Sequence, residues 1–79
     1  MKSFSVQLHS IDDVKRFVNA ACGQPFDIDI VSGRYTVDAK SIMGLFSLDL
    51  SKPIAVEVHG TEEDGRAFYE LIKDFADRA

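Results

Sequence analysis

Three short segments of this 79-residue chain alternate between apolar and polar residues, and this alternation constrains the fold more than any other feature. The segments are 4–9, 26–30 and 54–59. A period of two predicts strands with one buried face. Ser32 and Gly33 suit a tight hairpin turn after the second segment, so residues 34–37 are expected to form a fourth, shorter strand. The chain therefore predicts a four-stranded, largely antiparallel sheet.

Two longer segments carry apolar residues at helical spacing, and each begins with a residue suited to capping. Ser10 precedes the first helix, and Asp13 approximates a capping box with it. Thr61 precedes the second helix, and Gly23 is expected to end the first. The apolar stripes consist of Ile11, Val14, Phe17, Val18 and Ala21 in the first helix and of Phe68, Leu71, Ile72 and Phe75 in the second. Such stripes predict helices on one face of the sheet, an α+β fold formed by a single domain, residues 1–79.

The segment 40–48 is short and apolar, and Ser41 is a good N-cap for a third helix. If Leu45 and Leu48 face the core, three apolar side chains remain exposed, and exposed apolar patches usually mark partner sites. These three residues are Ile42, Met43 and Phe46. The alternative is a short helix that is buried on all sides and presents no patch.

The residues Lys40-Ser41-Ile42-Met43-Gly44-Leu45 resemble the segment around the regulatory serine of HPr, the small phosphocarrier of the bacterial sugar phosphotransferase system. The resemblance extends to residues 33–39, to residues 54–60 and to the closing helix, so it covers nearly the whole chain. It implies an HPr-like open-faced β-sandwich with the order βαββαβα and three helices on one face of the sheet. It also implies a bacterial cytoplasmic protein that is not itself an enzyme.

The chain departs from the family at the start of the first helix. The family carries its phosphoryl group on the histidine of a Gly-Ile-His-Ala-Arg-Pro motif, whereas residues 8–13 read Leu-His-Ser-Ile-Asp-Asp. An ungapped count back from Ser41 places Ser10 at the histidine position, and a slip of one residue would place His9 there. Asp12 and Asp13 replace the arginine and the proline, and carboxylates oppose an incoming phosphoryl group. We expect no efficient carrier activity; the alternative is an active carrier that uses His9 as the acceptor.

A functional role is better supported for Ser41 than for His9 or Ser10. In the resembled family this serine is modified by a dedicated kinase/phosphorylase, and the modified form binds a transcriptional regulator. A phosphate on Ser41 would add charge beside the predicted patch and change which partner docks there. We expect a non-catalytic protein that acts by protein–protein contact with such partners or with phosphotransferase components. The alternatives are that Ser41 is only a helix cap, or that the chain is a structural or interaction domain unrelated to sugar transport.

Composition narrows the remaining function classes. The formal net charge of −4 disfavours nucleic-acid binding, which needs a basic footprint. No apolar run approaches the length of a membrane span, and Cys22, the single cysteine, suits a reducing cytoplasm.

The spacing of histidine, cysteine and carboxylate residues indicates no metal or cofactor site. His59 lies at a strand end without an evident partner. We expect a cytoplasmic monomer.

Overall fold

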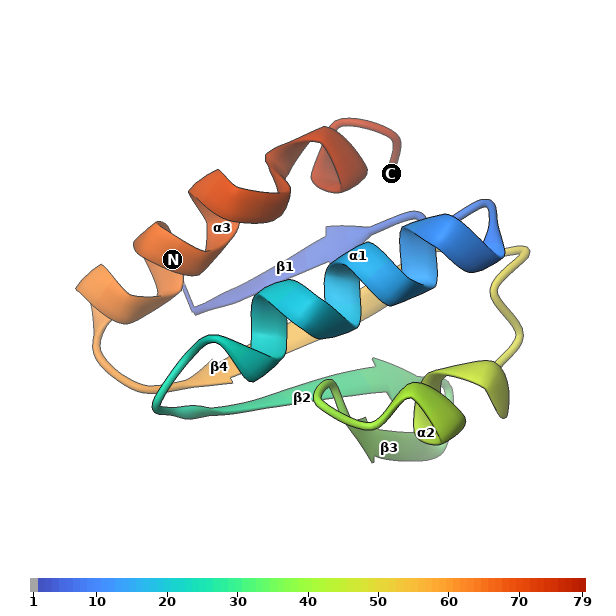
Figure 1. Ribbon diagram of the computed structural model, residues 1–79, viewed down its shortest axis with the longest axis horizontal. Helices are drawn as coiled ribbons and strands as arrows, with labels where there is room; N and C mark the ends of the chain where they lie inside the picture. Colours follow the sequence, from blue (N-terminus) through green and yellow to red (C-terminus); the bar gives the residue numbers. More distant parts are fainter. Residues whose placement is uncertain (1) are drawn as a thin grey trace.

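The computed structural model describes residues 2–79, which form one four-stranded sheet and three helices (Figure 1). The elements, in chain order, are β1 (Ser3–Val6), α1 (Ile11–Cys22), β2 (Asp27–Ser32), β3 (Tyr35–Asp38), α2 (Ile42–Phe46), β4 (Ile54–His59) and α3 (Glu62–Ala76). The observed order is the predicted βαββαβα. The three helices lie on one face of the sheet, as expected for an α+β open-faced sandwich.

The strands are arranged in the order β1-β4-β2-β3, and every neighbouring pair is antiparallel. Both edges of β4 are therefore paired, so β4 and β2 form the centre of the sheet. The hairpin between β2 and β3 has a two-residue loop, Gly33 and Arg34, closed by the pair Ser32 and Tyr35. Gly33 has a φ of +59°, which a glycine adopts without steric cost. Arg34 therefore belongs to the turn, and β3 begins one residue later than expected.

The core lies between the helices and the inner face of the sheet. Phe17 of α1 packs edge-on against Phe68 and Phe75 of α3, with ring centroids 5.7 and 6.3 Å apart. The three rings are completely buried. The apolar residues of the predicted strands and helix stripes largely face this core. Phe4 is half-buried against it, and the buried ones include Val6, Ile28, Ile30, Val56, Val58 and Phe68.

Leu71 was predicted to belong to the buried stripe of the closing helix, but it is 58% exposed, so that prediction is wrong. The backbone of α3 is non-helical at Ile72, with φ −127° and ψ 18°. The buried positions of this helix are Gly65, Phe68, Ile72 and Phe75. These positions are three or four residues apart and form one face of the helix, and Leu71 lies outside that face.

The predicted helix caps are present. Ser10 Oγ accepts the backbone N–H of Asp13 at 3.1 Å, and Gly23 is the C-cap of α1. At α3, Thr61 and Asp64 form a complete capping box. Ile11 does not join the buried stripe of α1, because the first residue of the helix lies past the core and is 63% exposed.

Candidate functional site

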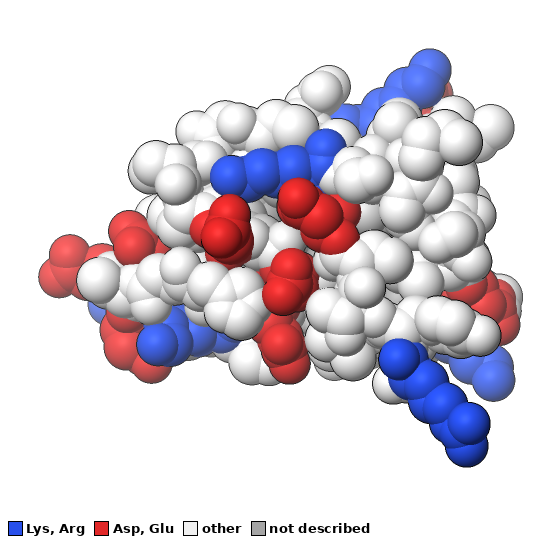
Figure 2. All heavy atoms as spheres, turned by 90° about the horizontal axis from the view of Figure 1, so that it is seen from below, with Lys and Arg blue, Asp and Glu red and all other residues white. Residues whose placement is uncertain are grey.

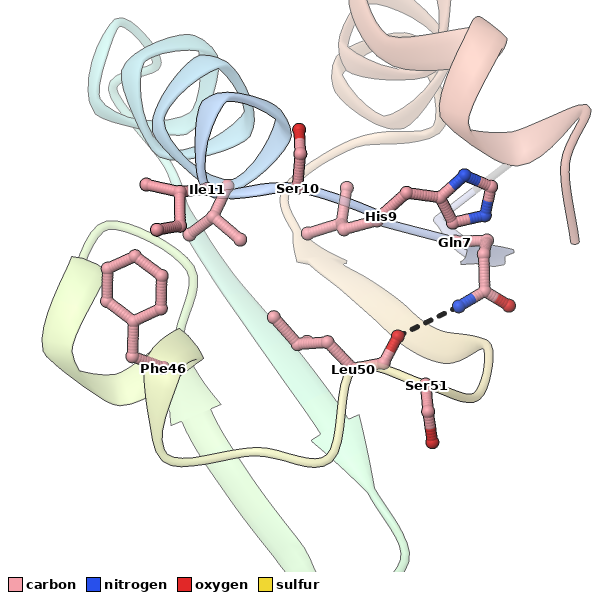
Figure 3. A pocket seen from close by; sticks show the side chains of 9 residues that line it. Gln7, His9, Ser10, Ile11, Phe46, Leu50 and Ser51 are labelled. Carbon is pink, nitrogen blue, oxygen red and sulfur yellow. Dashed lines mark hydrogen bonds between the residues drawn. The ribbon is translucent and has the colours of Figure 1, made fainter.

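The turn between β1 and α1 and the loop after α2 border an open hollow of about 660 Å³ (Figure 3). Its lining consists of Gln7, Leu8, His9, Ser10, Ile11, Val14, Phe46, Leu50 and Ser51. Figure 3 shows Ile11, Phe46 and Leu50 directed towards one another across its apolar end. Gln7 Nε2 donates to the carbonyl oxygen of Leu50 at 2.9 Å, which ties the loop after α2 to the end of β1.

The hollow brings together two of the sites that the sequence predicted separately. His9 and Ser10, which compete for the position of the family histidine, lie in the same lining as Phe46 of the predicted patch. Ser10 is occupied as the N-cap of α1. The His9 side chain is exposed, and Figure 3 shows its imidazole on the Gln7 side of the turn, away from Phe46.

Asp13 determines the electrostatics of this turn. Its Oδ2 accepts the backbone N–H of His9 at 2.9 Å and Nη1 of Arg78 at 2.7 Å. The hydrogen bond from His9 has the largest effect and lowers the pKa of Asp13 below its ordinary value of 3.8. Burial opposes this shift, and the hydrogen bond and charge of Arg78 lower the pKa further by smaller amounts. A backbone N–H and a guanidinium are groups that could hold phosphoryl oxygens. Here both bind a carboxylate of the chain itself.

Arg78 is the residue that sequence reasoning missed. It lies 65 positions from Asp13, beyond the end of α3, and no local pattern connects the two. Its guanidinium also lies over the Phe75 ring, 5.1 Å from the centroid. The sequence shows only that a basic residue stands at position 78, and this does not identify its contact with Asp13.

The second candidate site, around Ser41, is arranged largely as expected. Ser41 is half-buried, and its Oγ accepts the N–H of Gly44 at 3.1 Å. Leu45 is completely buried, whereas Met43 is 76% and Phe46 44% exposed. The alternative of a helix buried on all sides is therefore wrong.

Two details of the α2 segment differ from the prediction. Ile42 was expected to be exposed, but it is half-buried against the core, because α2 rests on both α1 and β3 and these cover two of its sides. Leu48 was expected to be buried, but it lies beyond the end of α2 at Phe46 and is also half-buried. The exposed apolar patch therefore consists of Met43 and Phe46.

A separate group of acidic residues lies on strands β2 and β3, beside His59 of β4. Asp27, Asp29, Asp38 and His59 line a shallow depression there, and His59 Nε2 lies 2.9 Å from Asp29 Oδ2, so His59 does have a partner. Seen from below, the molecule carries a group of acidic side chains near the middle of its surface (Figure 2). Among residues 2–79 no group of three potential ligands could hold a metal ion. No helix in the same range is long and apolar enough to cross a bilayer.

Three solved structures that share this fold are HPr or phosphocarrier proteins. HPr-C-His from Thermoanaerobacter tengcongensis superimposes with a TM-score of 0.78 at 24% identity, covering 98% of this chain and 92% of that chain. The histidine-containing phosphocarrier protein of Mycoplasma gives 0.73 at 18% identity, covering 92% and 89%. A phosphocarrier HPr from Bacillus anthracis str. Ames gives 0.70 at 26% identity, covering 94% of each chain. No curated protein matches the sequence.

A family comparison extends this likeness from the fold to the sequence. The family described as the PTS HPr component phosphorylation site matches residues 13–78. This range contains Ser41 and begins after His9 and Ser10. On this match the chain belongs to the PTS HPr family.

Proposed function

We propose that this HPr-family protein acts by protein–protein contact and does not carry a phosphoryl group on a histidine. The observation that supports this most directly is the position of the Asp13 carboxylate. It binds the His9 N–H and the Arg78 guanidinium, the two groups at this turn best suited to a phosphoryl group. A phosphoryl group on His9 or near Ser10 would have to approach this carboxylate, and like charges at short range repel.

The contact surface consists of the hollow and the adjoining exposed side chains of α2. Phe46 belongs to both, since it lines the hollow and is 44% exposed. Met43 and Ile11 extend the apolar surface, with exposed fractions of 76% and 63%. Aromatic and methionine side chains are enriched where proteins bind one another, and a few such anchors supply most of the binding energy.

Ser41 is the proposed regulatory site on this surface. The residue is half-buried and lies at the start of α2, two residues before Met43. A phosphate there carries −1.5 to −2 charges at pH 7. It would convert an apolar surface into one with an anion at its edge, so the unmodified and the modified protein would select different partners.

The test of the regulatory site uses an HPr kinase/phosphorylase with ATP, followed by intact mass and peptide mapping. We expect one acid-stable phosphate on Ser41, absent from Ser41→Ala and retained in Ser47→Ala, which removes a nearby serine at the other end of α2. Absence of label, in a reaction that labels a family HPr, would contradict the regulatory role.

The test of the surface is a titration of the same enzyme with unmodified protein variants. Met43→Ala and Phe46→Ala should weaken binding. Leu71→Ala is the matched control, because Leu71 is also an exposed apolar side chain but lies on α3. Equal affinities for all variants would show that Met43 and Phe46 do not belong to the contact surface.

A further inference from the structure

The N-caps of α1 and α3 differ in one hydrogen bond. In α3, Asp64 Oδ2 accepts the N–H of the N-cap residue Thr61 at 2.9 Å, the usual reciprocal geometry. In α1, Asp13 occupies the same third position, but its Oδ2 accepts the N–H of His9, one residue before the N-cap Ser10. The carboxylate of α1 therefore reaches one residue further back than its counterpart in α3.

Asp13 and Asp64 also differ in their ion pairs, because in the described part of the chain only Asp13 is paired with an arginine, Arg78. Arg78 Nη1 donates to Asp13 Oδ2 at 2.7 Å, whereas no lysine or arginine within residues 2–79 pairs with Asp64. The side chains of Arg78 and Asp13 are only 33% and 16% exposed. Such a pair is screened less by water and salt than a pair on the open surface.

Arg78 is itself held in place by the last turn of α3. Its guanidinium lies over the ring of Phe75, which is completely buried and so fixes the position of this turn. The carbonyl oxygen of Phe75 also accepts the backbone N–H of Gln7 at 3.0 Å. The end of the chain thus contacts both ends of the segment that runs from β1 into α1, at Gln7 and at Asp13.

We propose that Arg78 is a positioning residue, which holds the Asp13 carboxylate against the His9 N–H and thereby fixes the turn at the mouth of the hollow. This role rests on the proposed function, because Arg78 would keep the Asp13 carboxylate where it opposes an incoming phosphoryl group. It also couples the end of the chain to the start of α1.

The test is NMR spectroscopy of the full chain labelled with ¹⁵N and ¹³C. In Arg78→Gln, we expect the Asp13 carboxyl to titrate at higher pH and the His9 amide to exchange with solvent about three- to fivefold faster, as for the loss of a partly exposed ion pair. Arg78→Lys keeps the charge and should restore part of both effects. The matched control is Arg16→Gln, because Arg16 also lies over Phe75, at 4.1 Å, and pairs with Asp74 without contacting Asp13.

Two results would overturn the positioning role. One is an Arg78→Gln protein in which His9 exchange stays at the wild-type rate, since Arg78 would then affect only the charge of Asp13. The other is an equal change in Arg16→Gln, which would indicate general loosening of the α1–α3 contact. Both are distinguishable from failure of the proposed function, because phosphoryl transfer is measured separately on the unmutated chain.

Discussion

Leu45 and Phe46 are consecutive residues of α2, yet the side chain of Leu45 is completely buried while that of Phe46 is 44% exposed. Leu45→Ala should therefore lower the free energy of unfolding by ~2–5 kcal/mol, through lost burial and a residual cavity. Phe46→Ala should cost clearly less, although phenylalanine is the larger side chain. Urea unfolding followed by circular dichroism compares the two, and equal losses would show that Phe46 is a core residue and not part of a binding surface.

The cap at Ser41 allows the structural and the regulatory contributions of this residue to be separated. Ser41→Ala removes the acceptor of the Gly44 N–H and should cost ~1 kcal/mol. Ser41→Asp retains a capping oxygen, so its stability should stay close to that of the wild type while its surface charge changes. A loss of partner binding in Ser41→Asp at unchanged stability is the expected result. If Ser41→Asp is instead the less stable of the two variants, the cap assignment is wrong.

Gly60 supports the capping box of α3 by having no side chain. A Cβ at this position would lie 2.6 Å from Asp64 Oδ2 and 3.0 Å from Asp64 Cβ, so Gly60→Ala should displace the carboxylate from the Thr61 N–H. We expect a loss of ~1 kcal/mol, comparable to that of a helix cap. Gly23→Ala is the control, because a Cβ there meets only ordinary contacts of 3.5 Å or more. Similar losses in both variants would contradict the explanation by the capping box.

The contacts of Asp13 predict how stability depends on pH. Hydrogen bonds from His9 and Arg78 lower its pKa in the folded protein below the ordinary 3.8 of the unfolded chain. The stabilisation that Asp13 contributes is therefore complete well above pH 3.8, and it is lost as the pH falls through the lower, folded pKa. Asp13→Asn should flatten the acid limb of the stability curve, measured by thermal unfolding. Asp12→Asn removes the same charge from the same helical turn, and an equal flattening in that variant would contradict the assignment to Asp13.

The fold could be predicted from the sequence because its signals are local. Alternating residues such as Ile28 and Ile30 define a strand face, and Ser10, Ser41 and Thr61 each mark a helix start by a hydrogen bond within three residues. The errors arose where the environment of a residue is set by distant parts of the chain. Ile42 is partly covered because α2 is held between α1 and β3, and Leu71 is exposed because it lies outside the face of α3 that packs on the core.

The candidate site was predictable only in part for the same reason. The sequence indicated Ser41, Met43 and Phe46 as neighbours, and it indicated a conflict of charge at Asp13. It did not indicate that Arg78 neutralises this carboxylate, or that Gln7 holds the loop at Leu50 in place, because these contacts join residues 65 and 43 positions apart. Side chains that meet across such distances leave no periodic signal in the chain.

If the α1 turn does not accept a phosphoryl group, the protein should not be labelled by transfer from phosphoenolpyruvate through enzyme I of the phosphotransferase system. The protein and a histidine-containing HPr, such as that of Bacillus anthracis, are incubated in parallel and their intact masses compared before and after acid treatment. We expect an acid-labile phosphate on the HPr and none on this protein. Stoichiometric acid-labile label on this protein, absent from His9→Ala, would contradict the account and establish His9 as a phosphoryl acceptor.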